Sequence, residues 1–155
     1  MAADNSHGTV AFLSDPGTHG IADKVDIIET HISRIFLAGD RAWKMKREVK
    51  LPYVDFSTPE LRLESCRREV ELNSLTAPDL YLAAYPITRG ADGALQFDGE
   101  GTLVDGVVEM RRFEQDCLLD RIALAGGLTP EIMDETARKI EHFHRIAPFD
   151  RTKSG

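Results

Sequence analysis

The sequence predicts an α+β fold in which an antiparallel sheet packs against helices. Strand-like segments come first along the chain, a capped helix follows, further strand-like segments come next, and two helices close the sequence. An order of strands and helices that does not alternate regularly favours an antiparallel sheet with helices packed against it. The 155 residues are enough for a substantial core. No change in composition divides them, so we expect one folded region over residues 10–148 between flexible tails at 1–9 and 149–155.

The first strands are predicted from residue types. Residues 25–30 and 34–37 are rich in β-branched and aromatic side chains, which favour strands. Gly39 and Asp40 then supply a tight turn, and residues 41–46 resume an alternating pattern. These features predict a β-hairpin.

The next helix has a clear start signal. Ser57 is followed three residues later by Glu60, the spacing of a capping box, and Pro59 occupies the first turn. The helix is expected to reach about Leu75, with Leu63, Cys66 and Val70 on one face. Beyond it, strands are predicted at 81–87, 94–97 and 104–110, a helix at 117–125, and a last helix that begins at Thr129 and Pro130.

Charge and composition exclude several classes of protein. The net charge of −7 argues against a nucleic-acid-binding surface, which is normally basic. No apolar run approaches the roughly 20 residues of a membrane-spanning helix, and the polar N-terminus does not resemble a secretory signal. We therefore expect a cytoplasmic protein that binds neither nucleic acid nor membrane. Cys66 and Cys117 lack metal-ligand spacing and are interpreted as reduced core thiols.

Lys44 is the most informative position for function. On an alternating strand it shares a face with Ala42 and Lys46, while Trp43 and Met45 point to the opposite face as expected core residues. A strand lysine followed by a helix with acidic residues is the arrangement in which kinase-like enzymes hold nucleotide phosphates. The other basic positions are interpreted as solvated faces; these are Lys46, Arg47, Lys50, Arg111 and Arg112.

Four segments in order resemble the N-terminal region of bacterial aminoglycoside phosphotransferase-like proteins, which have a protein-kinase-like fold and are often fused to a P-loop ATPase or kinase domain. The resemblance extends from about Val10 to Pro148. The segments are E-T-H-I-S at 29–33, L-A-G-D-R-A-W-K-M-K-R at 37–47, L-P-Y-V-D-F-S-T at 51–58 and V-E-M-R-R-F at 108–113.

The resemblance implies roles for particular residues. Lys44 matches the lysine that holds the nucleotide phosphates of ATP, and Ala42 matches the small residue beneath the adenine. Either Glu69 or Glu71 matches the helix glutamate that pairs with the lysine. Val108, Glu109 and Met110 match the linker between two lobes, whose backbone would bind the adenine edge. Residues 30–33 lie where a glycine-rich loop would cover the phosphates, but they include no glycine.

The expected architecture is thus a kinase-like small lobe followed by the first helices of a truncated large lobe. The family's H-G-D-x-x-x-x-N loop and its following metal-binding aspartate are missing from the sequence. The resemblance therefore implies weak ATP binding, magnesium binding only if the missing lobe is supplied, and no phosphotransfer by this chain alone. The implied partners are a nucleotide and either a separate C-terminal lobe, a P-loop kinase domain or a second copy of the chain.

Two other functions stay open. The chain is alternatively a non-catalytic interaction or scaffold protein that keeps the lobe fold, with apolar surface available for a partner. A standalone enzyme would have to use His31, Asp55 and Glu69, which no spacing rule brings together. No metal site is expected, because His142 and His144 are two residues apart and lack the i, i+4 spacing of a helical zinc site.

Overall fold

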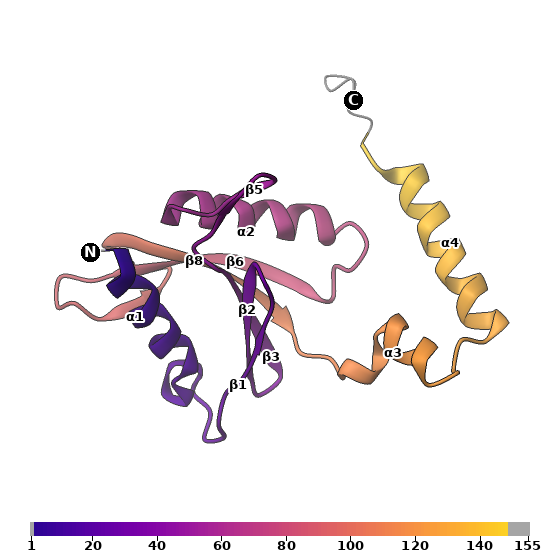
Figure 1. The fold of residues 1–155 in the computed structure, drawn as a ribbon, viewed down its shortest axis with the longest axis horizontal. Helices are drawn as coiled ribbons and strands as arrows, with labels where there is room; N and C mark the ends of the chain where they lie inside the picture. The colour runs from indigo at the N-terminus through magenta and orange to yellow at the C-terminus, as the bar shows by residue number, and fades with distance from the viewer. Residues whose placement is uncertain (1, 149–155) are drawn as a thin grey trace. The chain divides into compact units, whose positions relative to one another are not determined.

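The computed structural model describes residues 2–148 and shows an α+β fold, as the sequence predicts. Six antiparallel strands form the main sheet in the order β1-β2-β3-β8-β6-β7, and β4 and β5 form a separate two-stranded ribbon (Figure 1). The strands are β1 (Asp26–Glu29), β2 (Ser33–Ala38), β3 (Arg41–Lys46), β4 (Lys50–Leu51), β5 (Val54–Asp55), β6 (Tyr81–Arg89), β7 (Leu95–Phe97) and β8 (Thr102–Arg111). The helices are α1 (Ala2–Ser14), η1 (Pro16–His19), α2 (Pro59–Asn73), η2 (Gln115–Cys117), α3 (Leu119–Leu124) and α4 (Pro130–Ile146).

The chain divides into two compact units, Met1–Arg112 and Phe113–Gly155, although no change in composition marks the boundary. The first unit contains the whole sheet with α1 and α2. The second contains η2, α3 and α4. The expected tail at 149–155 lies outside the described residues.

The predicted hairpin is confirmed as strands β2 and β3 of the sheet. β2 pairs with β3 through the turn at Gly39 and Asp40, where Gly39 has a φ of 58° that favours glycine. β1 adds to β2, and β8 adds to the free side of β3 with Val108 opposite Lys44. Because Lys44 lies on an inner strand, its position is fixed by backbone pairing on both sides.

Helix α2 covers one face of the sheet. It packs on β8 and β6 (Figure 1). Its residue Cys66 forms a buried cluster with four residues of the sheet, Leu37, Ala42, Val108 and Met110. Gly106 permits the close approach, since a Cβ there would lie only 2.4 Å from the Cα of Leu63. The predicted apolar face of the helix is therefore correct, and the glycine on β8 lets the backbone of α2 lie close to the sheet.

Helix α2 begins one residue later than the capping box predicts. Its N-cap is Thr58, whose side chain accepts a hydrogen bond from the amide of Leu61. Ser57 is unavailable as a cap, because its amide and hydroxyl both donate to the Asp55 carboxylate. The helix ends at Asn73, two residues before the predicted end.

The opposite face of the sheet is covered by a segment that the sequence does not identify. Residues 1–9 are expected to be a flexible tail, but Ala2–Ser14 form α1. Leu13 is fully buried with Phe36, Met45, Ile87 and Val107, and Trp43 stacks on Phe97 with ring centroids 4.6 Å apart. The expectation is wrong because contact with the sheet, and not helix propensity, stabilises this helix.

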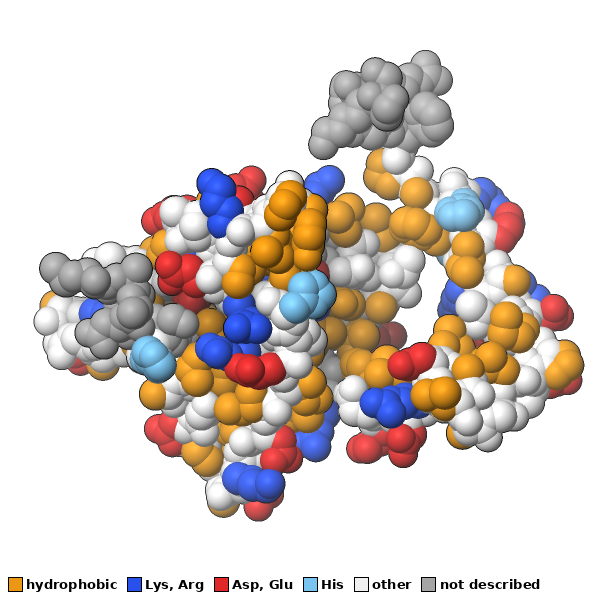
Figure 2. Space-filling model, viewed as in Figure 1, with side chains coloured by type: hydrophobic (Ala, Val, Ile, Leu, Met, Phe, Trp, Pro, Cys, Tyr) orange, Lys and Arg blue, Asp and Glu red, His pale blue; other side chains and the backbone are white. Residues whose placement is uncertain are grey.

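The second unit is helical and carries exposed apolar side chains. The predicted N-cap of its long helix is confirmed, because Thr129 accepts from the amide of Ile132 and Pro130 follows it. Leu124 is 81% exposed and Ile140 is 52% exposed. Orange hydrophobic side chains are accordingly visible over α3 and α4 in Figure 2.

Candidate functional site

The Lys44 cluster, which we define as Lys44, Lys46 and Glu69, lies between β3 and α2. The Lys44 Nζ lies 2.7 Å from the Glu69 Oε1, and the Lys46 Nζ donates to the Glu69 Oε2. Glu71 instead pairs with Arg68 on the same helix at 2.8 Å. The structure therefore selects Glu69 from the two candidates as the partner of Lys44.

Lys46 is buried, which corrects its interpretation as part of a solvated face. Its side chain is 7% exposed, and its ammonium lies 5.7 Å from the ring centroid of Phe56. Arg111 and Arg112 are exposed, as expected. Lys46 differs from them because side chains point alternately to the two faces of a strand, which places Lys46 on the helix-covered face with Ala42 and Lys44.

Glu69 is held in its charged form by the two lysines. Burial acts to raise its pKa, but hydrogen bonds from Lys44 and Lys46 outweigh that effect and hold the pKa below its usual value. At neutral pH the cluster therefore contains two ammonium groups and one carboxylate. Such an arrangement can receive one further negative charge from a ligand.

A buried ion pair fixes the helix that carries Glu69. The Arg62 Nε lies 2.8 Å from the Asp105 Oδ1, and both side chains are at most 4% exposed. Arg62 also donates to the carbonyls of Phe56 and Val104. Burial raises the pKa of Asp105 even though Arg62 and the amide of Gly106 act to lower it. Arg62 precedes Glu69 by seven residues, two helical turns, so its pairing with β8 also positions Glu69.

The residues expected near the adenine are distributed over both faces of the sheet. Ala42 and Met110 lie on the same face as Lys44 and are 7% and 8% exposed. Val108 is fully buried, so its side chain offers no surface to a ligand. Glu109 lies on the opposite face, where its Oε1 accepts from the Arg41 Nε at 3.0 Å.

The placement of residues 108–110 in a linker between lobes is wrong. All three lie inside β8 and pair with β3 on one side and β6 on the other. The alternation of their side chains continues the strand as far as Arg111, and the amide of Arg112 still donates to the carbonyl of Asp40. The boundary between the two units follows Arg112.

Residues 30–33 form the β1–β2 turn and are held without glycine. The Thr30 hydroxyl accepts from the Ser33 amide, and the Thr30 amide donates to the Ser33 carbonyl. The Arg47 guanidinium donates to the Thr30 carbonyl at 3.0 Å. This turn is ordered by its own hydrogen bonds and by the contact with Arg47.

The two cysteines differ in exposure, although both are expected in the core. Cys66 is fully buried on the inner face of α2, and desolvation raises the pKa of its thiol to about 12. Cys117 is exposed in η2, because the short helix around it has no buried residue.

This difference predicts selective thiol chemistry. A thiol-specific aromatic disulfide should modify one cysteine per folded chain, at Cys117, because only the thiolate reacts and Cys66 is both buried and protonated. Both should react in urea. The Cys117→Ser variant should show almost no modification until it unfolds, and rapid modification of that folded variant would contradict the burial of Cys66.

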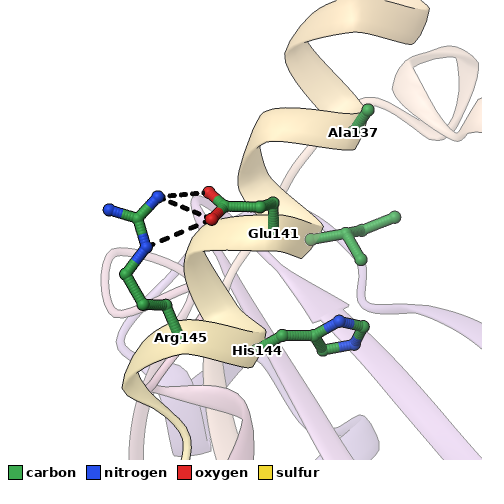
Figure 3. Close-up of a pocket in the computed structure, with 5 residues that line it drawn as sticks. Ala137, Glu141, His144 and Arg145 are labelled. Carbon is green, nitrogen blue, oxygen red and sulfur yellow. Dashed lines mark hydrogen bonds and ion pairs between the residues drawn. The ribbon is translucent and has the colours of Figure 1, made fainter.

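Two surface grooves lie on the helices. One includes Glu69 of the Lys44 cluster, and the other includes no member of that cluster. A groove of about 450 Å³ along α2 is lined by Asp55, Phe56, Leu61, Glu64, Ser65, Arg68, Glu69 and Leu72. The other is lined by residues of α4 alone. Figure 3 shows Ala137 and His144 on one side of that helix and the Glu141–Arg145 ion pair, 2.6 Å, on the other. Neither groove includes Lys44 or Lys46.

Residues 2–148 contain neither a cluster of metal-ligating side chains nor a helix that could span a membrane. No group of three or more histidine, cysteine, aspartate or glutamate side chains is placed to hold a metal ion. No helix in this part of the chain has the length and apolar character needed to cross a membrane. Of the residues required for a standalone enzyme, Asp55 binds Lys50 and Ser57, whereas Glu69 binds the two lysines.

Comparison with known proteins identifies longer mycobacterial relatives. The chain is 34% identical over 135 residues to an uncharacterized protein of Mycobacterium bovis and to uncharacterized proteins from two strains of Mycobacterium tuberculosis. The match covers 86% of this chain but only 25% of each relative, so the chain spans about a quarter of their length. No family model and no solved structure matches.

Proposed function

We propose that this chain is the nucleotide-binding lobe of an aminoglycoside phosphotransferase-like protein and binds Mg-ATP weakly at the Lys44 cluster. The observation that carries the proposal is the 2.7 Å contact between Lys44 on β3 and Glu69 on α2, which joins the two residues that the family resemblance pairs. A lysine oriented by a helix carboxylate is the device with which kinase-like enzymes hold the α- and β-phosphates. The antiparallel sheet with one helix across it is compatible with this fold.

The proposal assigns binding, and not transfer, to the chain by itself. Its sequence contains no H-G-D-x-x-x-x-N loop to supply a general base and metal ligands. Magnesium would then be held productively only with a complementary lobe or domain, and such a protein would work in the cytoplasm, where ATP is available. The match to one quarter of longer relatives is consistent with a lobe that acts together with further domains.

Calorimetry with Mg-ATP tests this function. We expect wild-type protein titrated to millimolar nucleotide to release heat of binding. Lys44→Ala should lose at least about tenfold in affinity, because a charge-assisted hydrogen bond to the phosphate is lost. Lys24→Ala is the matched control, since Lys24 is 85% exposed and its ion-pair partner among the described residues is the surface carboxylate of Asp26. Absence of binding by the wild type, or equal binding by Lys44→Ala, would refute the proposal.

The exposed apolar side chains of α3 and α4 favour a second candidate, a non-catalytic scaffold that associates through these helices. Leu124, Met133 and Ile140 are each more than half exposed. Apolar patches of this kind usually mark contact surfaces. Light scattering separates the candidates: a dimer disrupted by Ile140→Asp, together with no nucleotide binding, would favour the scaffold, whereas a monomer would count against self-association.

A further inference from the structure

The carboxylate of Glu69 serves two lysines of the same strand. Lys44 and Lys46 lie two residues apart on β3 and each donates to a different oxygen of Glu69. One carboxylate neutralises only one ammonium group. The division of Glu69 between them therefore determines which lysine can accept a ligand.

The surroundings of the two lysines are unequal. Lys46 is 7% exposed and lies over the ring of Phe56, whereas Lys44 is 25% exposed. A buried ammonium group that loses its anionic partner carries a large desolvation penalty. Lys44 reaches solvent and can exchange Glu69 for another anion at a smaller cost.

The ionisable groups around the cluster do not remove its excess positive charge. Cys66 is near both lysines, but its buried thiol stays protonated at neutral pH. Tyr81, on β6, interacts with Lys44 and Glu69, and burial raises its pKa, so it also stays neutral. Asp105 is occupied by Arg62. One positive charge is thus left over, at the more exposed lysine.

We propose that Lys46 is the resident counter-ion of Glu69 and thereby leaves Lys44 free to bind a phosphate group of the nucleotide. This inference rests on the proposed function of the site and adds a positioning residue to it. Lys46 acts through Glu69 and does not touch the phosphate. Without Lys46, Glu69 would hold Lys44 alone and cancel its charge.

The first test compares nucleotide binding by variants of the cluster. Lys46→Met should bind Mg-ATP about tenfold more weakly although Lys44 is intact, whereas Lys46→Arg should keep most of the affinity. The double variant Lys46→Met/Glu69→Gln should recover binding, because the glutamine amide oxygen can still accept from Lys44 and orient it but no longer neutralises its charge. A purely structural role for Lys46 would make the double variant no better than the single one, and that result would overturn the inference.

A second test needs no nucleotide. The carboxyl carbon of Glu69 can be titrated by NMR in the free protein, and Lys46→Met should raise the titration midpoint more than Lys44→Met does. The reverse order would overturn the role of Lys46 even if Mg-ATP binds. If the expected order is found but the wild type binds no Mg-ATP, the pairing of Lys46 with Glu69 is supported and the proposed nucleotide function fails.

Discussion

Replacing Asp105 with alanine is expected to lower the free energy of unfolding by about 3–5 kcal/mol, because it leaves a buried cation without its partner. Arg62 is 4% exposed, and Asp105 is its only carboxylate contact among the described residues; its other partners are the neutral carbonyls of Phe56 and Val104. The amide of Gly106 would lose its contact with the same carboxylate. Urea unfolding followed by the fluorescence of Trp43, the single tryptophan, measures the change.

Two further variants show whether burial causes this effect. Asp26→Ala removes an ion pair with Lys24 that is exposed and screened by solvent, so the free energy of unfolding should hardly change. The apolar double variant Arg62→Met/Asp105→Leu should regain much of the lost stability, because it removes both buried charges. If Asp105→Ala costs no more than Asp26→Ala, Arg62 does not depend on this carboxylate and does not fix α2.

Replacing Glu69 with glutamine is expected to lower the free energy of unfolding by about 1.5–3 kcal/mol at pH 7, the range for hydrogen bonds that involve charged groups. Lys46, which is 7% exposed, would retain an amide oxygen as acceptor but lose its counter-ion. Lys44 can turn to solvent and contributes less to this loss. Urea unfolding of the wild type and Glu69→Gln at pH 7 gives the difference, and Glu71→Gln, on the exposed side of α2, is the control.

The cost of Glu69→Gln should depend on pH in a defined direction. The pKa of Glu69 is lowered in the folded state, so its charged form stabilises the fold fully above the unfolded pKa of about 4.3. That contribution disappears as the pH falls through the lower folded value. The difference between wild type and variant should therefore be largest at pH 6–7 and shrink as the pH is lowered through the acid range. An equal difference at pH 7 and pH 3 would show that Glu69 is not held as a carboxylate.

Local signals in the sequence predict most of the elements correctly. The Gly39–Asp40 turn, the proline-capped starts of α2 and α4 and the alternation of β3 depend on neighbouring residues, which a sequence displays directly. Helix α1 lacks such signals, because Gly8, Thr9 and Val10 are poor helix formers. Its stability comes from Leu13 inside the core, a contact with strands far along the chain.

The candidate site was predictable only in part, for a similar reason. Alternation on β3 correctly places Lys44, Ala42 and Lys46 on one face. The run of basic residues around Lys46 nevertheless suggests a solvent-exposed face, and the burial of Lys46 cannot be predicted from it. The choice between Glu69 and Glu71 required the rotation of α2 about its axis, which depends on Gly106 and the Arg62–Asp105 pair. Arg62 and Asp105 are 43 positions apart in the sequence, and no local pattern indicates that they pair.

The most direct test of the nucleotide-binding site is an NMR titration of the wild-type protein with Mg-ATP, followed through backbone amide signals. We expect the largest shifts at Ala42, Lys44 and Glu69 and in the turn at residues 30–33, with small shifts around Leu13 and Phe97 on the opposite face. Lys44→Ala should reduce these shifts most strongly at Glu69 and in the turn at residues 30–33, the positions expected near the phosphates. Shifts confined to the opposite face, or to α4, would contradict a nucleotide site at the Lys44 cluster.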